Sequence, residues 1–141
     1  DRWVEAAEAV REWAVAHPHE WALLYGSPVP GYSAPLDTVL PGTRVSRALI
    51  AIVDDARVAG RLGPVPLTKL HRQVVHDMKA VTEYTGTGLS PDHLFAALLA
   101  WTQLFGLVSF ELFGQTRGVV TDGATFLRDA ATAMAVRIGL L

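Results

Sequence analysis

The sequence predicts a single all-α domain of six helices, and three observations lead to this prediction. Apolar residues recur every three or four positions over most of the 141 residues, which is the spacing of one helix face. Glycine and proline stand between these stretches, where they begin or end helices. No stretch alternates apolar and polar residues over the length of a strand. Because half of the residues are hydrophobic, a chain of this size has enough apolar side chains to bury a core.

The first two helices are expected at residues 2–17 and 18–25. An apolar stripe runs along the first, with the charged side chains outside it; it consists of Trp3, Ala7, Val10, either Trp13 or Ala14, and His17. Pro18 suits the first turn of the second helix, and Gly26 suits its end. The following segment 27–42 contains four prolines and two glycines, which predicts a loop with fixed bends.

Two middle helices are expected at residues 43–59 and 67–84. Thr43 is a candidate N-cap for the first, and Gly60 is its stop signal. Its inward positions are Val45, Leu49, Ile52, Val53 and Ala56. The second helix follows the Gly-Pro-Val-Pro segment at 63–66 and ends at the Thr-Gly-Thr-Gly segment at 85–88; its inward positions are Leu70, Val74, Met78 and Val81.

The fifth helix, which Ser90 caps and Pro91 begins, is apolar on almost every side as far as Gly114. Within roughly an 80° arc lie Leu94, Leu98, Trp101, Phe105, Val108 and Leu112. Across the helix lie Ala96, Leu99, Gln103, Gly106, Leu107 and Phe110. A small domain usually covers only one such face, so the second face predicts a partner molecule.

An alanine-rich sixth helix is expected from Thr121 or Asp122 to Ile138, antiparallel to the fifth because the loop between them is short. Two copies of this helix pair would form an intermolecular four-helix bundle in a two-fold homodimer. The predicted dimer interface consists of Ala96, Leu99, Gln103, Leu107, Phe110, Phe126, Leu127, Ala130 and Met134.

A membrane span is the alternative interpretation of residues 93–114, since about 20 apolar residues cross a bilayer. Gln103 and Glu111 lie within the stretch, and no cluster of lysine and arginine flanks it. The chain contains no second segment of this kind. We therefore predict a buried helix and no membrane contact.

The composition argues against several classes of site. With a net charge of −2, the chain lacks the excess of basic residues that nucleic-acid binding requires. It contains no cysteine, which excludes disulfides and thiolate sites. The five histidines include no helical i,i+4 pair, and neither a Gly-x-Ser-x-Gly motif nor a phosphate-binding loop is present. We predict no catalytic residues, no metal and no cofactor. The chain begins at Asp1 without a signal-peptide pattern, which suggests a fragment of a cytoplasmic protein.

A small-molecule site between helices is suggested by large aromatic side chains accompanied by histidines, which supply apolar area together with a polar handle. The predicted ligand-binding residues are Trp13, His17, Trp21, His71, Val75, Met78, Trp101 and Phe105.

Two segments resemble a known family. HPHEWALLYGSPVPGYSAP at 17–35 and AWTQLFGLVSFELFG at 100–114 are similar to the C-terminal domain of TetR-type transcriptional regulators, in the subgroup named for its Trp, His and Gly pattern. The resemblance implies a homodimeric effector-binding domain that follows an N-terminal helix-turn-helix of about fifty residues, which recognises a palindromic operator. These 141 residues contain no counterpart of that domain, so DNA binding is expected of the parent protein alone.

The functional prediction is a ligand-sensing and dimerising domain of a repressor, whose effector is a small apolar molecule. A stand-alone helical carrier of hydrophobic molecules is the alternative, since it would share the pocket without any role at DNA. A small helical enzyme that uses His71 or His76 as a base is a third hypothesis. The absence of a paired nucleophile or carboxylate motif argues against it.

Overall fold

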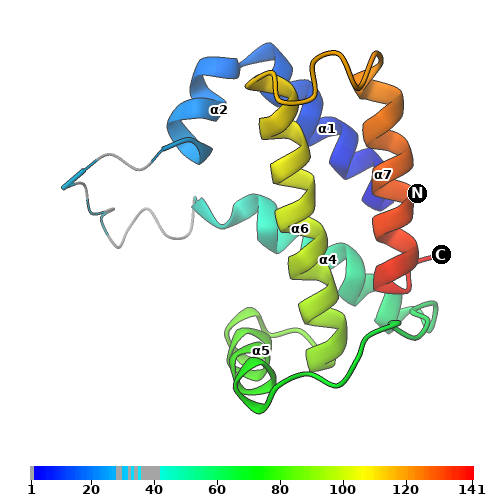
Figure 1. Cartoon of the computed structure of the whole chain (residues 1–141). Helices are drawn as coiled ribbons and strands as arrows, with labels where there is room; N and C mark the ends of the chain where they lie inside the picture. The colour runs from blue at the N-terminus through cyan, green and yellow to red at the C-terminus, as the bar shows by residue number, and fades with distance from the viewer. Residues whose placement is uncertain (1, 28–29, 32, 34, 36–41) are drawn as a thin grey trace.

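The computed structural model describes residues 2–27, 30, 31, 33, 35 and 42–141. Within these residues the chain forms six helices and no strand, which confirms the predicted all-α fold (Figure 1). The helices are α1 (Arg2–Ala16), α2 (Pro18–Tyr25), α4 (Arg44–Val58), α5 (Arg72–Thr85), α6 (Pro91–Leu112) and α7 (Gly123–Ile138). Most of the loop predicted at 27–42 lies outside the described residues.

Helix α6 runs through the middle of the fold and contacts α1, α4, α5 and α7 (Figure 1). Leu94, Leu104 and Val108 are fully buried on it, whereas Ala97 and Ala100 are small enough for neighbouring helices to approach closely. Burying a side chain such as leucine stabilises the fold by about 1.5–3 kcal/mol. By length and composition α6 would also cross a membrane, but a core helix meets the same criterion.

The core along α1 includes Trp3, Ala7 and Ala14, all fully buried. The structure thus decides between the two residues that the sequence left open, because Ala14 is buried while 40% of Trp13 is exposed. On α7 the buried residues are Leu127, Ala131, Met134, Ala135 and Ile138. Helix α7 packs against both α1 and α6, so its apolar stripe is shared between them.

Side-chain caps fix several helix ends where the sequence predicted them. The Ser90 hydroxyl accepts a hydrogen bond from the backbone N–H of His93 at 3.3 Å, and Pro91 begins α6. The Asp122 carboxylate accepts from the backbone N–H groups of Ala124 and Thr125 at the start of α7. Each cap satisfies amide donors that have no partner within the helix.

The helix predicted at 67–84 begins instead at Arg72, so the prediction was wrong for residues 67–71. Leu67 is half-buried against the core, and its amide donates to the Val65 carbonyl in a turn at 2.9 Å. His71 has an extended backbone and caps α5, because its Nδ1 accepts from the amide of Gln73 at 3.2 Å. The tertiary contact of Leu67 and this histidine cap together outweigh the helical spacing of the apolar residues.

The segment before α5 is tied to the ends of α6 and α7. The Gly63 amide donates to the Gly139 carbonyl at 2.7 Å, and His93 Nε2 donates to the Gly63 carbonyl at 2.9 Å. Gly139 has a positive φ of 87°, and a Cβ added there would lie 2.4 Å from the Gly63 oxygen. Glycine is therefore required at 139 for both conformation and space.

We predict that Gly139→Ala lowers the free energy of unfolding more than Gly60→Ala does, as measured by urea denaturation. Gly60 also has a positive φ, but a Cβ there would meet nothing within 4 Å. The Gly60 variant should lose only the cost of the left-handed conformation, about 1–2 kcal/mol. Equal losses in the two variants would show that the close approach to Gly63 is unimportant.

Candidate functional site

The outer side of the α6–α7 pair carries large apolar side chains that the described part of the chain leaves exposed. Leu99 is 49% exposed, Phe110 55% and Phe126 47%. We call this surface, which also includes Gln103, Ala130 and Arg137, the α6–α7 face. Soluble monomers seldom expose several large apolar residues together, so a face of this kind indicates an interaction surface.

The residues predicted for the dimer interface occupy different depths in this structure. Leu99, Gln103, Phe110 and Phe126 are exposed on the α6–α7 face, and Leu107 and Ala130 are half-buried beside them. Ala96, Leu127 and Met134 are buried between the helices of the same chain. These three residues support the α6–α7 face from beneath.

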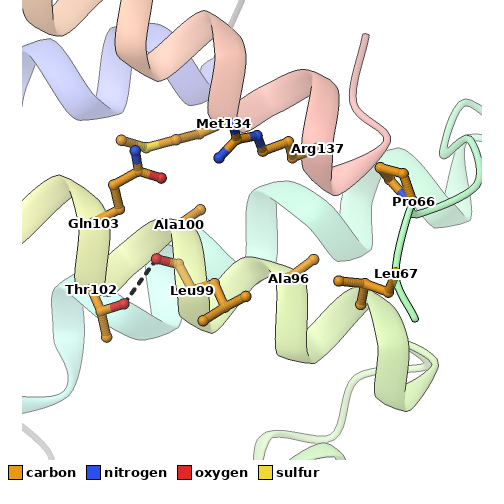
Figure 2. Close-up of a pocket in the computed structure, with 9 residues that line it drawn as sticks. All are labelled: Pro66, Leu67, Ala96, Leu99, Ala100, Thr102, Gln103, Met134 and Arg137. Carbon is orange, nitrogen blue, oxygen red and sulfur yellow. Dashed lines mark hydrogen bonds between the residues drawn. The ribbon is translucent and has the colours of Figure 1, made fainter. Parts of the chain in front are cut away.

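A hollow of about 480 Å³ opens between α6, α7 and the segment before α5 (Figure 2). Its walls are mainly apolar, and its residues are Pro66, Leu67, Ala96, Leu99, Ala100, Thr102, Gln103, Met134 and Arg137. The Thr102 hydroxyl donates to the Leu99 carbonyl at 2.8 Å, so its hydrogen is already bonded within α6. The Gln103 amide and the Arg137 guanidinium are the other polar groups in this hollow.

Aromatic rings from α1, α2 and the middle part of α6 meet in one cluster. Helix α2 lies toward the end of α6 that is far from α5 (Figure 1). We call Trp13, His17, Trp21, Tyr25, Trp101 and Phe105 the aromatic cluster. The Trp21 and Phe105 ring centroids lie 5.2 Å apart, and the Trp101 and Phe105 centroids lie 5.6 Å apart. Such tilted and edge-on contacts stabilise by about 0.5–1.5 kcal/mol beyond area burial.

The polar atoms of the aromatic cluster differ in how well they are satisfied. Trp21 Nε1 donates to the Ser109 hydroxyl at 3.1 Å, and His17 Nδ1 donates to the Trp13 carbonyl at 2.9 Å. Trp101 Nε1 is buried and has no acceptor among the residues described. Burial raises the pKa of the Tyr25 phenol above its ordinary value. The cluster therefore holds one buried donor with unused hydrogen-bonding capacity.

The residues predicted for ligand binding fall into two groups. Trp13, His17, Trp21, Trp101 and Phe105 lie in the aromatic cluster. The other three belong to α5 or its cap: His71 caps the helix, Met78 is buried in the core, and Val75 lines a separate hollow beside Leu70.

Tyr25 joins the cluster although the sequence prediction left it out. Its ring lies 4.6 Å from that of Trp21 and 4.8 Å from that of Phe105. Tyr25 follows Trp21 by four residues, which places both side chains on one face of α2. This spacing was the feature of the sequence that could have identified Tyr25 as part of the cluster.

A bidentate ion pair joins α1 to the end of α6. Arg11 Nε donates to Glu111 Oε2 at 2.8 Å, and Arg11 Nη2 donates to Glu111 Oε1. The hydrogen bond to Glu111 raises the pKa of the Arg11 guanidinium. The carboxylate also faces the first residue of α7, because a Cβ added at Gly123 would lie 2.2 Å from Glu111 Oε1. A carboxylate at this position is favoured by the partial positive charge of a helix N-terminus.

No group of three or more histidines or acidic residues able to hold a metal ion occurs in the part of the chain that the structure describes. The prediction that this domain has no metal site remains a prediction.

Arg11→Ala should lower the free energy of unfolding by about 1–3 kcal/mol, because it leaves the Glu111 carboxylate, 28% exposed, without its partner. Arg128→Ala is the control, since Arg128 bonds Glu8 at 2.7 Å but is 65% exposed. Its loss should stay below about 1 kcal/mol. Thermal and urea unfolding measure both, and equal losses would contradict a structural role for the Arg11 pair.

Comparisons with known proteins agree with this architecture. Residues 3–134 match the family described as tetracyclin repressor-like, C-terminal domain. The chain is 32% identical over 142 residues to HTH-type transcriptional regulator Mb1846 of Mycobacterium bovis and to HTH-type transcriptional regulator Rv1816 of Mycobacterium tuberculosis.

The alignments cover 96% of this chain but 58% of each relative, so the chain spans little more than half of their length. The names of the family and of the relatives are those of transcriptional regulators rather than enzymes. An all-helical fold, a match over nearly its whole length and these relatives together show that the chain belongs to the tetracyclin repressor-like C-terminal domain family of TetR-type regulators.

Proposed function

We propose that this domain dimerises and senses a small apolar molecule in a cytoplasmic TetR-type repressor. The observation that carries the proposal is the uncovered α6–α7 face on a domain of this family. The named relatives favour a regulator over a stand-alone carrier, because both are HTH-type transcriptional regulators by name and the alignments with them cover 96% of this chain.

The physical character of the α6–α7 face supports dimerisation. Three large apolar side chains on it are about half exposed, and burying apolar surface contributes about 25 cal/mol per Å². On α7, Ala130 and Ala133 have short side chains, so a helix from a second copy can approach closely. A two-fold axis brings the same face of each copy together, so each copy covers the α6–α7 face of the other.

Phe110→Glu should convert the dimer to a monomer in light scattering, because the interface would bury an unpaired carboxylate. Leu23→Glu is the matched control: it makes the same kind of change at an 84% exposed residue of α2, outside the α6–α7 face. This control should remain dimeric, and far-UV circular dichroism should show that both variants keep their helices. A dimeric Phe110 variant would contradict the proposed interface.

The aromatic cluster is the proposed effector site. Sites between helices typically combine apolar walls with a few polar groups that orient the ligand. The rings of Trp21, Trp101 and Phe105 supply apolar surface, and the buried Trp101 N–H is a donor without an acceptor among the described residues. A ligand acceptor at that donor would remove a penalty of about 1–3 kcal/mol for leaving it unsatisfied.

Helix α1 is the proposed lever from effector to DNA. It carries Trp13 of the aromatic cluster near its end, and at its beginning Arg2 forms an ion pair with Asp55 of α4 at 2.7 Å. In the full-length protein an N-terminal helix-turn-helix would precede α1 and bind a palindromic operator. Effector binding changes the affinity for DNA only if it favours one packing of α1, by typically ~1–3 kcal/mol.

Compounds that raise the melting temperature of the full-length protein and release it from operator DNA should lose both effects in Trp101→Ala. The substitution removes the donor and one wall of the aromatic cluster. Tyr84→Ala is the control, since Tyr84 is 63% exposed on α5 and outside the cluster. Fluorescence anisotropy of labelled operator measures release. An unchanged response in the Trp101 variant would place the effector elsewhere.

A further inference from the structure

Each helix of the α6–α7 face carries one charged residue on the side that a second copy would cover. At 100° per residue, Asp92 on α6 lies within about 20° of Leu99 and Phe110 around the helix. By the same measure, Arg137 on α7 lies within about 20° of Phe126. Both charged side chains are exposed. The outward side of each helix is therefore an apolar stripe that includes one charge.

The two charges lie at the same end of the α6–α7 face. Asp92 is in the first turn of α6, and Arg137 is in the last turn of α7. The start of α6 lies beside the end of α7, because Ala96 and Arg137 line one hollow (Figure 2). At the other end, Glu111 of α6 meets Gly123 of α7. The face thus has a charged end and an apolar end, where its two phenylalanines lie.

Neither charge has a partner among the residues that the structure describes. No ion pair or hydrogen bond joins the Asp92 carboxylate or the Arg137 guanidinium to another described residue. Asp92 also borders a hollow with Lys69 and Arg72, but it forms no ion pair with either of them. Burying an ion is unfavourable unless an opposite charge compensates it, so a molecule that covers this end must supply both charges.

We propose that Asp92 of each copy pairs with Arg137 of the other copy, and that these two ion pairs fix the orientation of the dimer. The inference rests on the proposed dimer and names the residues that decide how its two copies align. In a two-fold dimer every contact between two different residues occurs twice, so one kind of pair compensates all four charges. A guanidinium fork also matches a carboxylate in geometry.

This pairing requires the two-fold axis to run along the helix pair. Such an axis brings charged end to charged end, and it packs α6 of one copy antiparallel to α7 of the other. An axis across the helices would instead place Asp92 and Arg137 of one copy against the phenylalanines of the other. Both ions would then lose water without compensation, which favours the axis along the helices.

The same orientation suits a protein that binds DNA through domains preceding α1. Arg2, in the first turn of α1, lines a hollow with Leu140 and Leu141, which follow α7. The start of α1 therefore lies toward the charged end of its own copy. With the axis along the helices, both copies of α1 begin at one end of the dimer, where two helix-turn-helix domains would reach the half-sites of one operator.

The test exchanges the charges in full-length protein. Asp92→Arg leaves two positive charges at the charged end of a copy, and Arg137→Asp leaves two negative ones. Each variant alone should raise the dimer dissociation constant at least about tenfold in analytical ultracentrifugation, because close charge pairs across interfaces couple by that amount or more. In an equal mixture, native mass spectrometry should find more heterodimer than the half that random pairing gives. The double variant should again form a homodimer.

Arg128→Asp is the matched control, because it makes the same substitution on α7 but points about 180° away from Arg137 around the helix. Arg128 bonds Glu8 of its own chain. The Arg128 variant should remain dimeric by itself, and a mixture with Asp92→Arg should give no excess of heterodimer. Far-UV circular dichroism should show that all variants keep their helices.

A mixture of Asp92→Arg and Arg137→Asp without excess heterodimer would overturn the proposed pairing, because a pair within one chain or an axis across the helices gives that result. Single variants that dimerise as tightly as the native protein would overturn it as well. A failure of the dimer itself is seen separately, as a native protein that is monomeric or a Phe110→Glu variant that remains dimeric.

Discussion

The need to cover α6, which is apolar on almost every side, is the requirement around which the other helices are arranged. α1, α4, α5 and α7 each contact part of it, and α2 reaches it through the contact between Trp21 and Phe105. These neighbours bury Leu94, Leu104 and Val108 but leave the side that carries Leu99 and Phe110 in contact with solvent. The same apolar helix therefore supplies both the core of the domain and the surface on which a second copy is proposed to dock.

The ion pair between Arg11 and Glu111 joins three helices at one point. It links α1 to the end of α6, and its carboxylate lies against Gly123 at the start of α7. Trp13 of the aromatic cluster lies on the same helix as Arg11, two residues further along. A change in the packing of the aromatic rings can therefore be passed along α1 as a rigid element, and at the same time to the helix pair that forms the proposed interface.

The Trp101 N–H of the aromatic cluster is a buried donor that has no acceptor among the described residues. The neighbouring Trp21 N–H, by contrast, donates to the Ser109 hydroxyl. A neutral donor among aromatic rings suits an apolar molecule that carries an acceptor, which is why the aromatic cluster is the proposed effector site.

The sequence by itself determined the helical fold and most helix ends. Ser90, Pro91 and Asp122 act within a few residues along the chain, so their capping is a local property. The aromatic residues of α1, α2 and α6 were also identifiable, because bulky rings on inward stripes carry a strong signal. The sequence also showed the outward side of α6 as a second apolar arc, but it did not show what covers that side.

Only the tertiary structure decided which of the apolar stripes meet. The helical period shows that residues share a face but not which neighbour that face contacts, so Leu127 and Met134 prove to be buried within the chain. Leu67 follows a helical spacing, yet its contact with the core holds residues 67–71 outside α5. The unpaired position of Arg137 has the same cause, because only the packing of α6 against α7 creates the hollow into which it points.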